Sequence, residues 1–266
     1  MISISNKVKV SRPLVTVVTV CWNADALIRK TIESVLAQSY PCIEYIIVDG
    51  ESHDSTMDIV NEYRGRITHI ISEKDNGIYD AMNKGISRAN ANSKYITFLN
   101  AGDVFYNAHV VEQMLSRATS QETHLYGDHM RCGRLSTSMG RVTSRRLLTG
   151  MICHQTILFL TEYHRSNPYN TRWSICADYQ LLLEMTLAGE PFEKVEVVVV
   201  IFDTTGISST HKWKLREEKR AILKQHPRLY LKMRLLKLIP FRNVKRSIQK
   251  RLDILRLRKK MKSGEL

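Results

Sequence analysis

The stretch KYITFLNAGDVFY, Lys94 to Tyr106, joins a run of strand-forming residues to an abrupt polar stop. Residues 95–99 are aromatic, β-branched or aliphatic, a composition typical of a short buried strand. Asn-Ala-Gly-Asp then ends the run, and these turn-forming residues place the carboxylate of Asp103 just beyond the strand. Asp103 is therefore a candidate functional residue at the mouth of a buried strand.

Three earlier segments repeat this pattern of an apolar strand followed by polar residues. Alternating strands and helices form right-handed β-α-β units, so we predict an α/β fold with a mostly parallel nucleotide-binding sheet flanked by helices. Ligands bind such sheets at the carboxyl ends of the strands. The expected strands and helices are, in order, 14–20, 24–38, 43–48, 53–65, 67–72, 77–91 and 95–99. The polar clusters that follow the strands are Cys21-Trp22-Asn23, Asp49-Gly50, Glu73 to Asn76, and Asn100 to Asp103.

After Asp103 the alternation loosens, and the second half reads as an elaboration of the same sheet. We expect a main domain over residues 1–210, with a nucleotide-binding half at 14–105 and an acceptor half at 106–210, and a basic helical tail at 211–266. The elements expected in the second half are a helix at 107–118, a strand at 124–128, an irregular segment at 130–141, a strand at 152–160, a helix at 177–189 and a strand at 193–202.

Composition narrows the class of protein. The chain has 266 residues, of which 43% are hydrophobic, enough to bury a substantial core. Its five cysteines are scattered without a C-x-x-C, which argues against a disulfide framework and a zinc cluster and favours a reducing compartment. No apolar run reaches the ~18–20 residues of a membrane-spanning helix, and the polar start lacks the apolar core of a signal peptide. We expect a cytoplasmic protein.

Six short motifs in order resemble the inverting glycosyltransferases of family 2, which have the GT-A fold, and in particular the bacterial colanic-acid and capsule types. The resemblance covers residues 14–210 and implies a nucleotide-sugar donor, UDP-linked by expectation. The motifs are TVCWN after the first strand, IIVDGESHDST after the second, SEKDNGIYDAMNKGI across the third strand and its helix, FLNAGD after the fourth, HQ at His154-Gln155, and ADYQLLLEM near residue 180.

The resemblance assigns several residues to the donor nucleotide. It implies that Asp49 accepts hydrogen bonds from the uracil or ribose and that the Trp22 ring lies against the base; the alternatives are an ordinary turn aspartate and a packing aromatic. A surface ion pair between Asp80 and Lys84 would contribute only ~0.3–0.5 kcal/mol, too little to account for the polar stretch. His154 is expected near the donor phosphates or the acceptor, or else as a hydrogen-bonded core residue. The expected nucleotide-binding set is Trp22, Asn23, Asp49, Asn76, Gly77, Asp80, Asn83 and Lys84, with Asn100 and His154 on the donor and acceptor side.

Two carboxylates have distinct expected roles. Departure of a nucleoside diphosphate builds negative charge, and we expect Asp103 to hold the Mg²⁺ or Mn²⁺ that stabilises it. Similar enzymes carry two or three acids there, whereas this chain has Asn100 and Gly102, so the alternative is a loop-capping aspartate. Asp178, at the start of a predicted helix, is expected to be the catalytic base, or else a helix-dipole partner. His211 is a weaker candidate for the diphosphate or metal.

The tail is strongly basic and contributes to a formal net charge of +14. An apolar stripe from Val244 to Leu255, flanked by Lys and Arg, predicts an amphipathic helix, so we expect residues 212–262 to bind an anionic membrane surface. The alternative is a helix packed on the protein itself. Nucleic acid is disfavoured as a partner, because no recognition motif accompanies the charge.

Together these observations predict an inverting transferase that moves a single sugar to a lipid-linked oligosaccharide on the inner face of the cytoplasmic membrane, in surface polysaccharide biosynthesis. A processive synthase is disfavoured, because transmembrane helices and a Q-x-x-R-W signature are absent from the sequence. The alternatives are a sugar-1-phosphate nucleotidyltransferase and a non-catalytic basic module that binds membranes or RNA.

Overall fold

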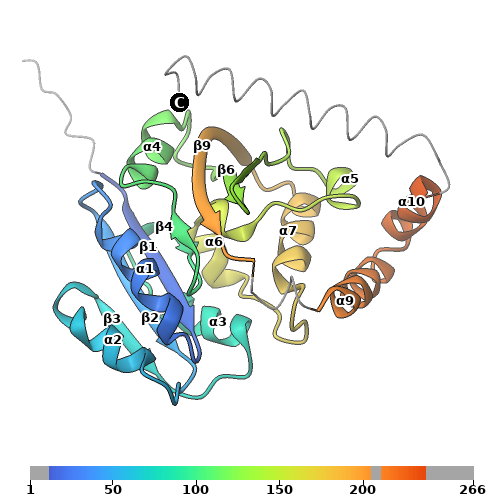
Figure 1. Ribbon diagram of the computed structural model, residues 1–266. Helices are drawn as coiled ribbons and strands as arrows, with labels where there is room; N and C mark the ends of the chain where they lie inside the picture. Colours follow the sequence, from blue (N-terminus) through green and yellow to red (C-terminus); the bar gives the residue numbers. More distant parts are fainter. Residues whose placement is uncertain (1–11, 205–210, 238–266) are drawn as a thin grey trace, which may run out of the picture.

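A computed structural model describes residues 12–204 and 211–237 of the chain. Its centre is a nine-stranded sheet in the order β3-β2-β1-β4-β8-β6-β9-β5, with β7 paired to β6, and Figure 1 shows helices on both sides of this sheet. The strands are β1 (Leu14–Cys21), β2 (Ile43–Asp49), β3 (His69–Ser72), β4 (Ser93–Phe98), β5 (Val104–Phe105), β6 (His124–Arg131), β7 (Arg134–Ser136), β8 (Ile157–Leu160) and β9 (Phe192–Phe202).

Alternate residues of the central strands face two separate core layers. Val18 and Val20 of β1 lie in one buried cluster, whereas Val15 and Val17 lie in the other. Burial on both faces explains why these strands are continuous apolar runs. The helices are α1 (Asp25–Leu36), α2 (Thr56–Glu62), α3 (Ile78–Arg88), α4 (Val110–Arg117), α5 (Ser144–Leu147), α6 (Thr161–Ser166), α7 (Ala177–Ala188), α9 (Lys212–Lys224) and α10 (Pro227–Lys237).

The two halves of the sheet differ in strand direction. β3, β2, β1 and β4 are mutually parallel, as predicted. β8 then runs antiparallel to β4, and β6 runs antiparallel to β8, whereas β6 and β9 are parallel. The parallel sheet predicted from the alternating pattern is therefore confirmed for the first half, and the second half is mixed.

Two sequence expectations in the second half are wrong in detail. The predicted strand 152–160 is a strand only over Ile157–Leu160, and His154–Thr156 forms a 3₁₀ turn that precedes it. The segment 130–141, expected to be irregular, contains β7, which pairs with β6 in a hairpin. The segment 152–160 has buried apolar residues both before the turn and in the strand that follows it. Its sequence therefore resembles one continuous buried strand.

The first part of the basic tail packs on the body of the protein. Ile222 and Leu223 of α9 and Leu229 of α10 are buried in the same core cluster as α7. Figure 1 shows α9 beside α7. For residues 212–237 the structure thus shows the alternative of a helix packed on the protein, and the stripe from Val244 to Leu255 lies outside the described residues.

Candidate active site

The carboxyl ends of the parallel strands meet at one edge of the sheet, as expected. Cys21 of β1 pairs with Asp49 of β2, and Asp49 pairs with Ser72 of β3. Just beyond these ends lies a pocket of about 430 Å³. It is lined by Trp22, Gly50, Glu51, His53, Lys74 and Asp75. Trp22 is 65% exposed there, so its ring is available to a ligand and is not a packing aromatic of the core.

Gly50 lies close to the side chains of Asp75 and Trp22 in this pocket. A Cβ atom at position 50 would collide with the carboxylate of Asp75 and come within 3.4 Å of the Trp22 ring. Glycine therefore lets the loops after β1, β2 and β3 approach one another. The nucleotide-binding role expected of Trp22 stays a prediction. Asp75, which follows β3 and was not selected from the sequence, lines the same pocket as Trp22.

Asp49 holds the loops of this edge together. Its buried carboxylate accepts hydrogen bonds from the Ser52 backbone N–H at 3.0 Å and from the Ser72 hydroxyl at 2.8 Å. The Cys21 thiol lies 3.7 Å from the other carboxylate oxygen, and burial raises the pKa of that thiol. Both oxygens of Asp49 thus have partners within the chain. Its contact with the nucleotide stays a prediction.

Asn23 joins the loop after β1 to the loop after β2. Its backbone N–H donates to the Ser52 hydroxyl at 2.8 Å, and its side-chain oxygen accepts from the His53 N–H at 2.9 Å. Its φ of 46° lies in the left-handed region, which asparagine adopts more readily than most residues. Asn23 therefore shapes the rim of the pocket next to Trp22.

The loop before α3 is held by two carboxylates. Asp80 accepts a hydrogen bond from the Asn76 N–H at 2.9 Å, and Asp75 accepts one from the Gly77 N–H at 2.8 Å. Gly77 has a φ of 112°, which favours glycine. The sequence had grouped these residues correctly with the strand end, and the structure places them beside Asp75, which lines the pocket.

The side chains of Asn83 and Lys84 bind two other segments of the chain. The Asn83 side chain exchanges two hydrogen bonds with the backbone of Tyr169, at 2.8 and 2.9 Å. Lys84 forms an ion pair with Glu73 at 2.9 Å and donates to the Lys74 carbonyl at 2.7 Å. Asp80, Asn83 and Lys84 therefore do not act on one shared partner. Asn83 fixes the segment before α7, and Lys84 fixes the loop after β3.

Asp103 is buried in the turn between β4 and β5, and its carboxylate has two hydrogen-bond partners. One carboxylate oxygen accepts from the Asp203 N–H at 2.7 Å, and the other accepts from the Gln155 side-chain amide at 2.9 Å. Burial raises the pKa of Asp103 to about 6, although the hydrogen bonds from Asp203 and Gln155 oppose this rise. The Asp203 carboxylate, which follows β9, lies 3.3 Å from Lys30 Nζ.

A small divalent cation binds preferentially to carboxylate and amide oxygens of this kind. Mg²⁺ is usually bound by one or two carboxylates together with substrate phosphates. The nearby charge of Asp203 also raises the pKa of Asp103, and the side-chain oxygen of Asn100 is buried without a hydrogen-bond partner. Within residues 12–204 and 211–237, no group of three or more His, Cys, Asp or Glu side chains could hold a metal alone. A diphosphate would have to complete the coordination.

Asp178 and His154 form a buried pair. His154 Nδ1 lies 3.1 Å from one Asp178 oxygen, and the other oxygen accepts from the Tyr179 N–H at 2.7 Å. His154 Nε2 is buried without a hydrogen-bond partner. His154 and Gln155 are neighbours in the 3₁₀ turn, so this turn contacts both Asp178 and Asp103.

Aromatic residues surround Asp178. Burial, and then the nearby Asp178 charge, raises the pKa of Tyr79 well above its usual value, and the same two causes raise the pKa of Tyr169. The Tyr169 hydroxyl and the Trp173 indole N–H are buried without hydrogen-bond partners. Unpaired buried polar atoms are uncommon, and here they mark groups that a bound ligand or water would satisfy.

Sequence reasoning missed Gln155 and Asp203 as site residues. Asp203 follows the long apolar strand β9 just as Asp103 follows β4, so its position at a strand end was an available signal. The only sequence signal for Gln155 was its position in the HQ motif. His211 is exposed just before α9, and its proposed contact with a diphosphate stays a prediction.

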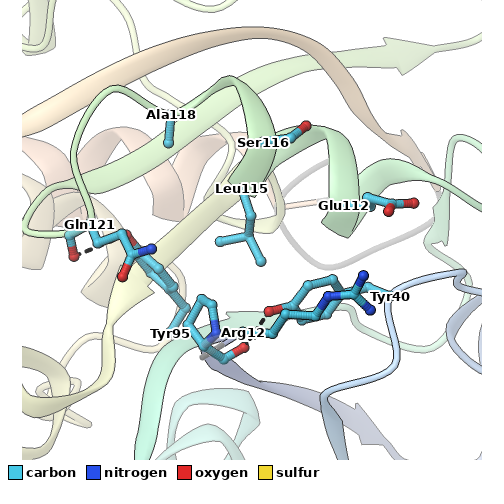
Figure 2. Close-up of a pocket in the computed structure, with 9 residues that line it drawn as sticks. Arg12, Tyr40, Tyr95, Glu112, Leu115, Ser116, Ala118 and Gln121 are labelled. Atoms are coloured by element: carbon cyan, nitrogen blue, oxygen red, sulfur yellow. Dashed lines mark hydrogen bonds between the residues drawn. The ribbon is translucent and has the colours of Figure 1, made fainter. Parts of the chain in front are cut away.

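A second pocket, of about 210 Å³, lies beside the starts of β1 and β4 (Figure 2). It is bounded by Pro13 before β1, Tyr95 near the start of β4, and Leu115 of α4. Tyr40 donates to the Pro13 carbonyl and Tyr95 donates to the Gln121 carbonyl, so both phenols are used structurally. Neither Asp103 nor Asp178 lines this pocket, so it adds nothing to the candidate active site.

The geometry agrees with comparisons to known proteins. Residues 16–179 match the sequence model of Glycosyl transferase family 2. The chain belongs to this family. This family 2 glycosyltransferase is 32% identical over 208 residues to an uncharacterized glycosyltransferase of Mycobacterium tuberculosis, and the alignment covers 75% of this chain and 78% of the relative. Family membership decides against both alternatives, the nucleotidyltransferase and the non-catalytic module.

Two further relatives have names that mention a biosynthetic role. The PGL/p-HBAD biosynthesis glycosyltransferase of Mycobacterium bovis is 29% identical over 174 residues, covering 63% of this chain and 67% of the relative. The glycosyltransferase TuaG of Bacillus subtilis, named for teichuronic acid biosynthesis, is 41% identical over 95 residues, covering 35% of this chain and 37% of the relative.

Solved structures confirm the GT-A fold of this family 2 glycosyltransferase. Residues 1–349 of Staphylococcus aureus TarS, in complex with UDP, superpose with a TM-score of 0.60 at 16% identity, covering 71% of this chain and 60% of that one. The mannosyltransferase PcManGT of Pyrobaculum calidifontis, in complex with GDP-Man and Mn²⁺, gives 0.63 at 16% identity, covering 82% and 65%.

Proposed function

We propose that the enzyme transfers a single sugar, with inversion, from a UDP-sugar to a lipid-linked oligosaccharide in the synthesis of a surface polysaccharide. The observation that supports this most is that two buried carboxylates, Asp103 in the turn after β4 and Asp178 in the first turn of α7, are contacted by the neighbouring residues Gln155 and His154 of one turn. In this proposal Asp103 binds the metal ion at the donor diphosphate, and Asp178 takes the proton of the acceptor hydroxyl.

The donor nucleotide binds at the edge of the parallel strands. Its base lies against Trp22 in the pocket formed with Asp75, and its diphosphate lies toward Asp103. A Mg²⁺ or Mn²⁺ ion held by Asp103, with Asp203 and Asn100, would stabilise the charge that develops on the diphosphate. UDP in TarS and Mn²⁺ in the mannosyltransferase support a nucleotide donor and a divalent ion.

The chemical step is a direct displacement at the anomeric carbon. The acceptor oxygen forms a bond to this carbon as the bond to the diphosphate oxygen breaks, so the configuration inverts. Asp178 takes the proton of the acceptor hydroxyl, and the nucleoside diphosphate leaves with the bonding electrons. His154, which lies 3.1 Å from Asp178, holds the carboxylate in position for this transfer.

The acceptor class is supported by the exposed surface of α9 and α10. Trp213 is 64% exposed, and Leu231 and Leu235, one turn apart on α10, are 59% and 53% exposed. Exposed basic residues accompany them: Lys212, Arg216, Arg228, Lys232 and Arg234. Apolar side chains among cations suit an anionic bilayer, where lipid-linked acceptors reside. Among the described residues no helix is long and apolar enough to span a membrane.

A donor panel tests the proposed reaction. The purified chain is incubated with UDP-, GDP- and dTDP-sugars, Mn²⁺ and octyl glycosides as soluble acceptors, and the product is analysed by proton NMR. We expect turnover with a UDP-sugar and an anomeric configuration opposite to that of the donor. Turnover with a GDP- or dTDP-sugar alone would contradict the UDP assignment, and retention of configuration would contradict the mechanism.

Replacing Trp22 with Ala is expected to weaken UDP binding roughly 5- to 150-fold, because stacking of an aromatic ring on a base contributes about 1–3 kcal/mol. Isothermal titration with UDP measures the effect. Trp213→Ala is the matched control, because Trp213 is equally exposed but lies on α9. An unchanged affinity in Trp22→Ala would show that the base binds elsewhere.

The same two variants, with their roles exchanged, test the proposed membrane-binding surface of α9 and α10. Trp213→Ala is expected to weaken binding to phosphatidylglycerol vesicles roughly 5- to 10-fold, equivalent to about 1–1.4 kcal/mol for the partial burial of an aromatic side chain. Vesicle sedimentation at low and high salt measures this, with Trp22→Ala as the control. Equal vesicle binding by wild type and Trp213→Ala would remove Trp213 from the proposed membrane surface.

A further inference from the structure

Glu218 of α9 binds the segment that leads into α7, and the proposed mechanism gives it no role. One Glu218 oxygen accepts hydrogen bonds from the Ser174 N–H at 3.2 Å and the Ser174 hydroxyl at 2.8 Å. The other accepts from the backbone N–H groups of Ile175 and Cys176, both at 3.0 Å. A single carboxylate thus binds three consecutive backbone N–H groups.

These N–H groups lie immediately before the catalytic residue. α7 begins at Ala177, and its N-cap residue, Cys176, makes no side-chain capping hydrogen bond. The first N–H groups of a helix have no partner within the helix. Glu218 supplies a partner for the N-cap N–H of Cys176 from a distant part of the chain, and it also binds the N–H groups of Ser174 and Ile175, which lead into the helix. Its negative charge suits the positive end of the helix dipole. Asp178 follows Cys176 by two residues.

Other contacts hold α9 in this place. Lys219 Nζ lies 4.2 Å from the centroid of the Tyr179 ring, so neighbouring residues of α9 contact the chain on both sides of Asp178. The Cys176 thiol lies 3.5 Å from the Leu215 carbonyl. Ile222 and Leu223 bury the inner face of α9 in the same core cluster as Leu181 and Leu182 of α7.

We propose that Glu218 is a positioning residue for catalysis: it fixes the turn that carries Asp178, so that this carboxylate meets the acceptor hydroxyl. The inference rests on the proposed role of Asp178 as base. It makes α9 part of the catalytic apparatus, although the sequence assigned this helix to a separate tail. A small displacement of a reacting group can lower a rate about 100-fold.

Glu218→Gln is a sharp test because it keeps the size of the side chain. The amide retains one oxygen, but its NH₂ group cannot accept a hydrogen bond, so at least one backbone N–H loses its partner. Glu217→Gln is the matched control, since Glu217 is the preceding residue of α9 and is exposed. Glu218→Asp keeps both oxygens on a shorter side chain.

The measurement is kcat for the most active donor of the panel with an octyl glycoside acceptor, expressed per UDP-binding site counted by isothermal titration. Counting sites removes any unfolded fraction from the comparison. We expect Glu218→Gln to lower kcat roughly 10- to 100-fold with an unchanged donor KM, because the donor site is formed by other loops. Glu218→Asp should give an intermediate kcat, and Glu217→Gln should match the wild type.

Two outcomes separate this inference from the proposed function. If Asp178→Asn loses activity but Glu218→Gln keeps the wild-type kcat per site, Glu218 does not position the base and the inference is overturned. If Asp178→Asn keeps full activity, the role of Asp178 as base in the proposed function is overturned. An equal fractional loss of the total rate and of UDP-binding sites in Glu218→Gln would leave kcat per site at the wild-type value, would assign this residue to folding alone and would also overturn the inference.

Discussion

Asp178→Asn is expected to lower kcat by roughly 10²- to 10⁴-fold, the usual contribution of a positioned general base. The amide cannot take the proton of the acceptor hydroxyl, although it is close in size to the carboxylate and can accept the hydrogen bond from the Tyr179 N–H. Because Asp178 lies on α7 and the base pocket is formed by the loops after β1, β2 and β3, UDP affinity should stay close to that of the wild type.

The control for this variant is on the same helix. Glu184 of α7 is exposed and accepts a hydrogen bond from the Gln180 side chain at 2.7 Å. Glu184→Gln changes the charge of α7 by the same amount and should leave kcat unchanged. A wild-type kcat in Asp178→Asn would exclude Asp178 as the base and would direct attention to His154, whose Nε2 is buried without a partner.

Asp103→Asn is expected to weaken donor binding at least about 10-fold in the presence of Mn²⁺, because a neutral amide is a poorer ligand for a hard cation than a carboxylate. The donor KM measured over a range of Mn²⁺ concentrations reports this loss. In the wild type KM should fall as Mn²⁺ is added, and in the variant this dependence should be much weaker.

Asp128 provides a matched control for the loss of a buried carboxylate. It is buried in β6, lies 3.5 Å from Lys194 Nζ, and accepts a hydrogen bond from the Ser138 N–H. Asp128→Asn should preserve the dependence of donor KM on Mn²⁺. The same dependence in Asp103→Asn as in the wild type would show that Asp103 only caps its loop.

The sequence predicted the parallel half of the sheet because these strands are buried on both faces. Val15, Val17, Val18 and Val20 must all be apolar, and such runs are readable without a structure. The carboxylates at the strand ends followed from the same pattern. Asp103 and Asp49 were found in this way, and Asp203 could have been found by applying the rule to β9.

The contacts between distant segments could not be read from the sequence. Glu218 is one acid in a basic segment, and its partners are backbone N–H groups more than forty residues earlier, which carry no side-chain signature. The basic composition of α9 suggested a solvated or membrane-bound helix, but its buried residues Ile222 and Leu223 dock it on the body. For Lys84 the helical spacing predicted Asp80 as a neighbour, whereas tertiary packing supplies Glu73.

The most direct test of the division between the donor carboxylate and the acceptor carboxylate is a calorimetric titration of Asp103→Asn and Asp178→Asn with UDP, each with and without Mn²⁺. We predict that Asp178→Asn shows the wild-type gain in UDP affinity on adding Mn²⁺ and that Asp103→Asn loses most of this gain. If Asp178→Asn loses the gain and Asp103→Asn keeps it, the roles assigned to the two carboxylates are wrong.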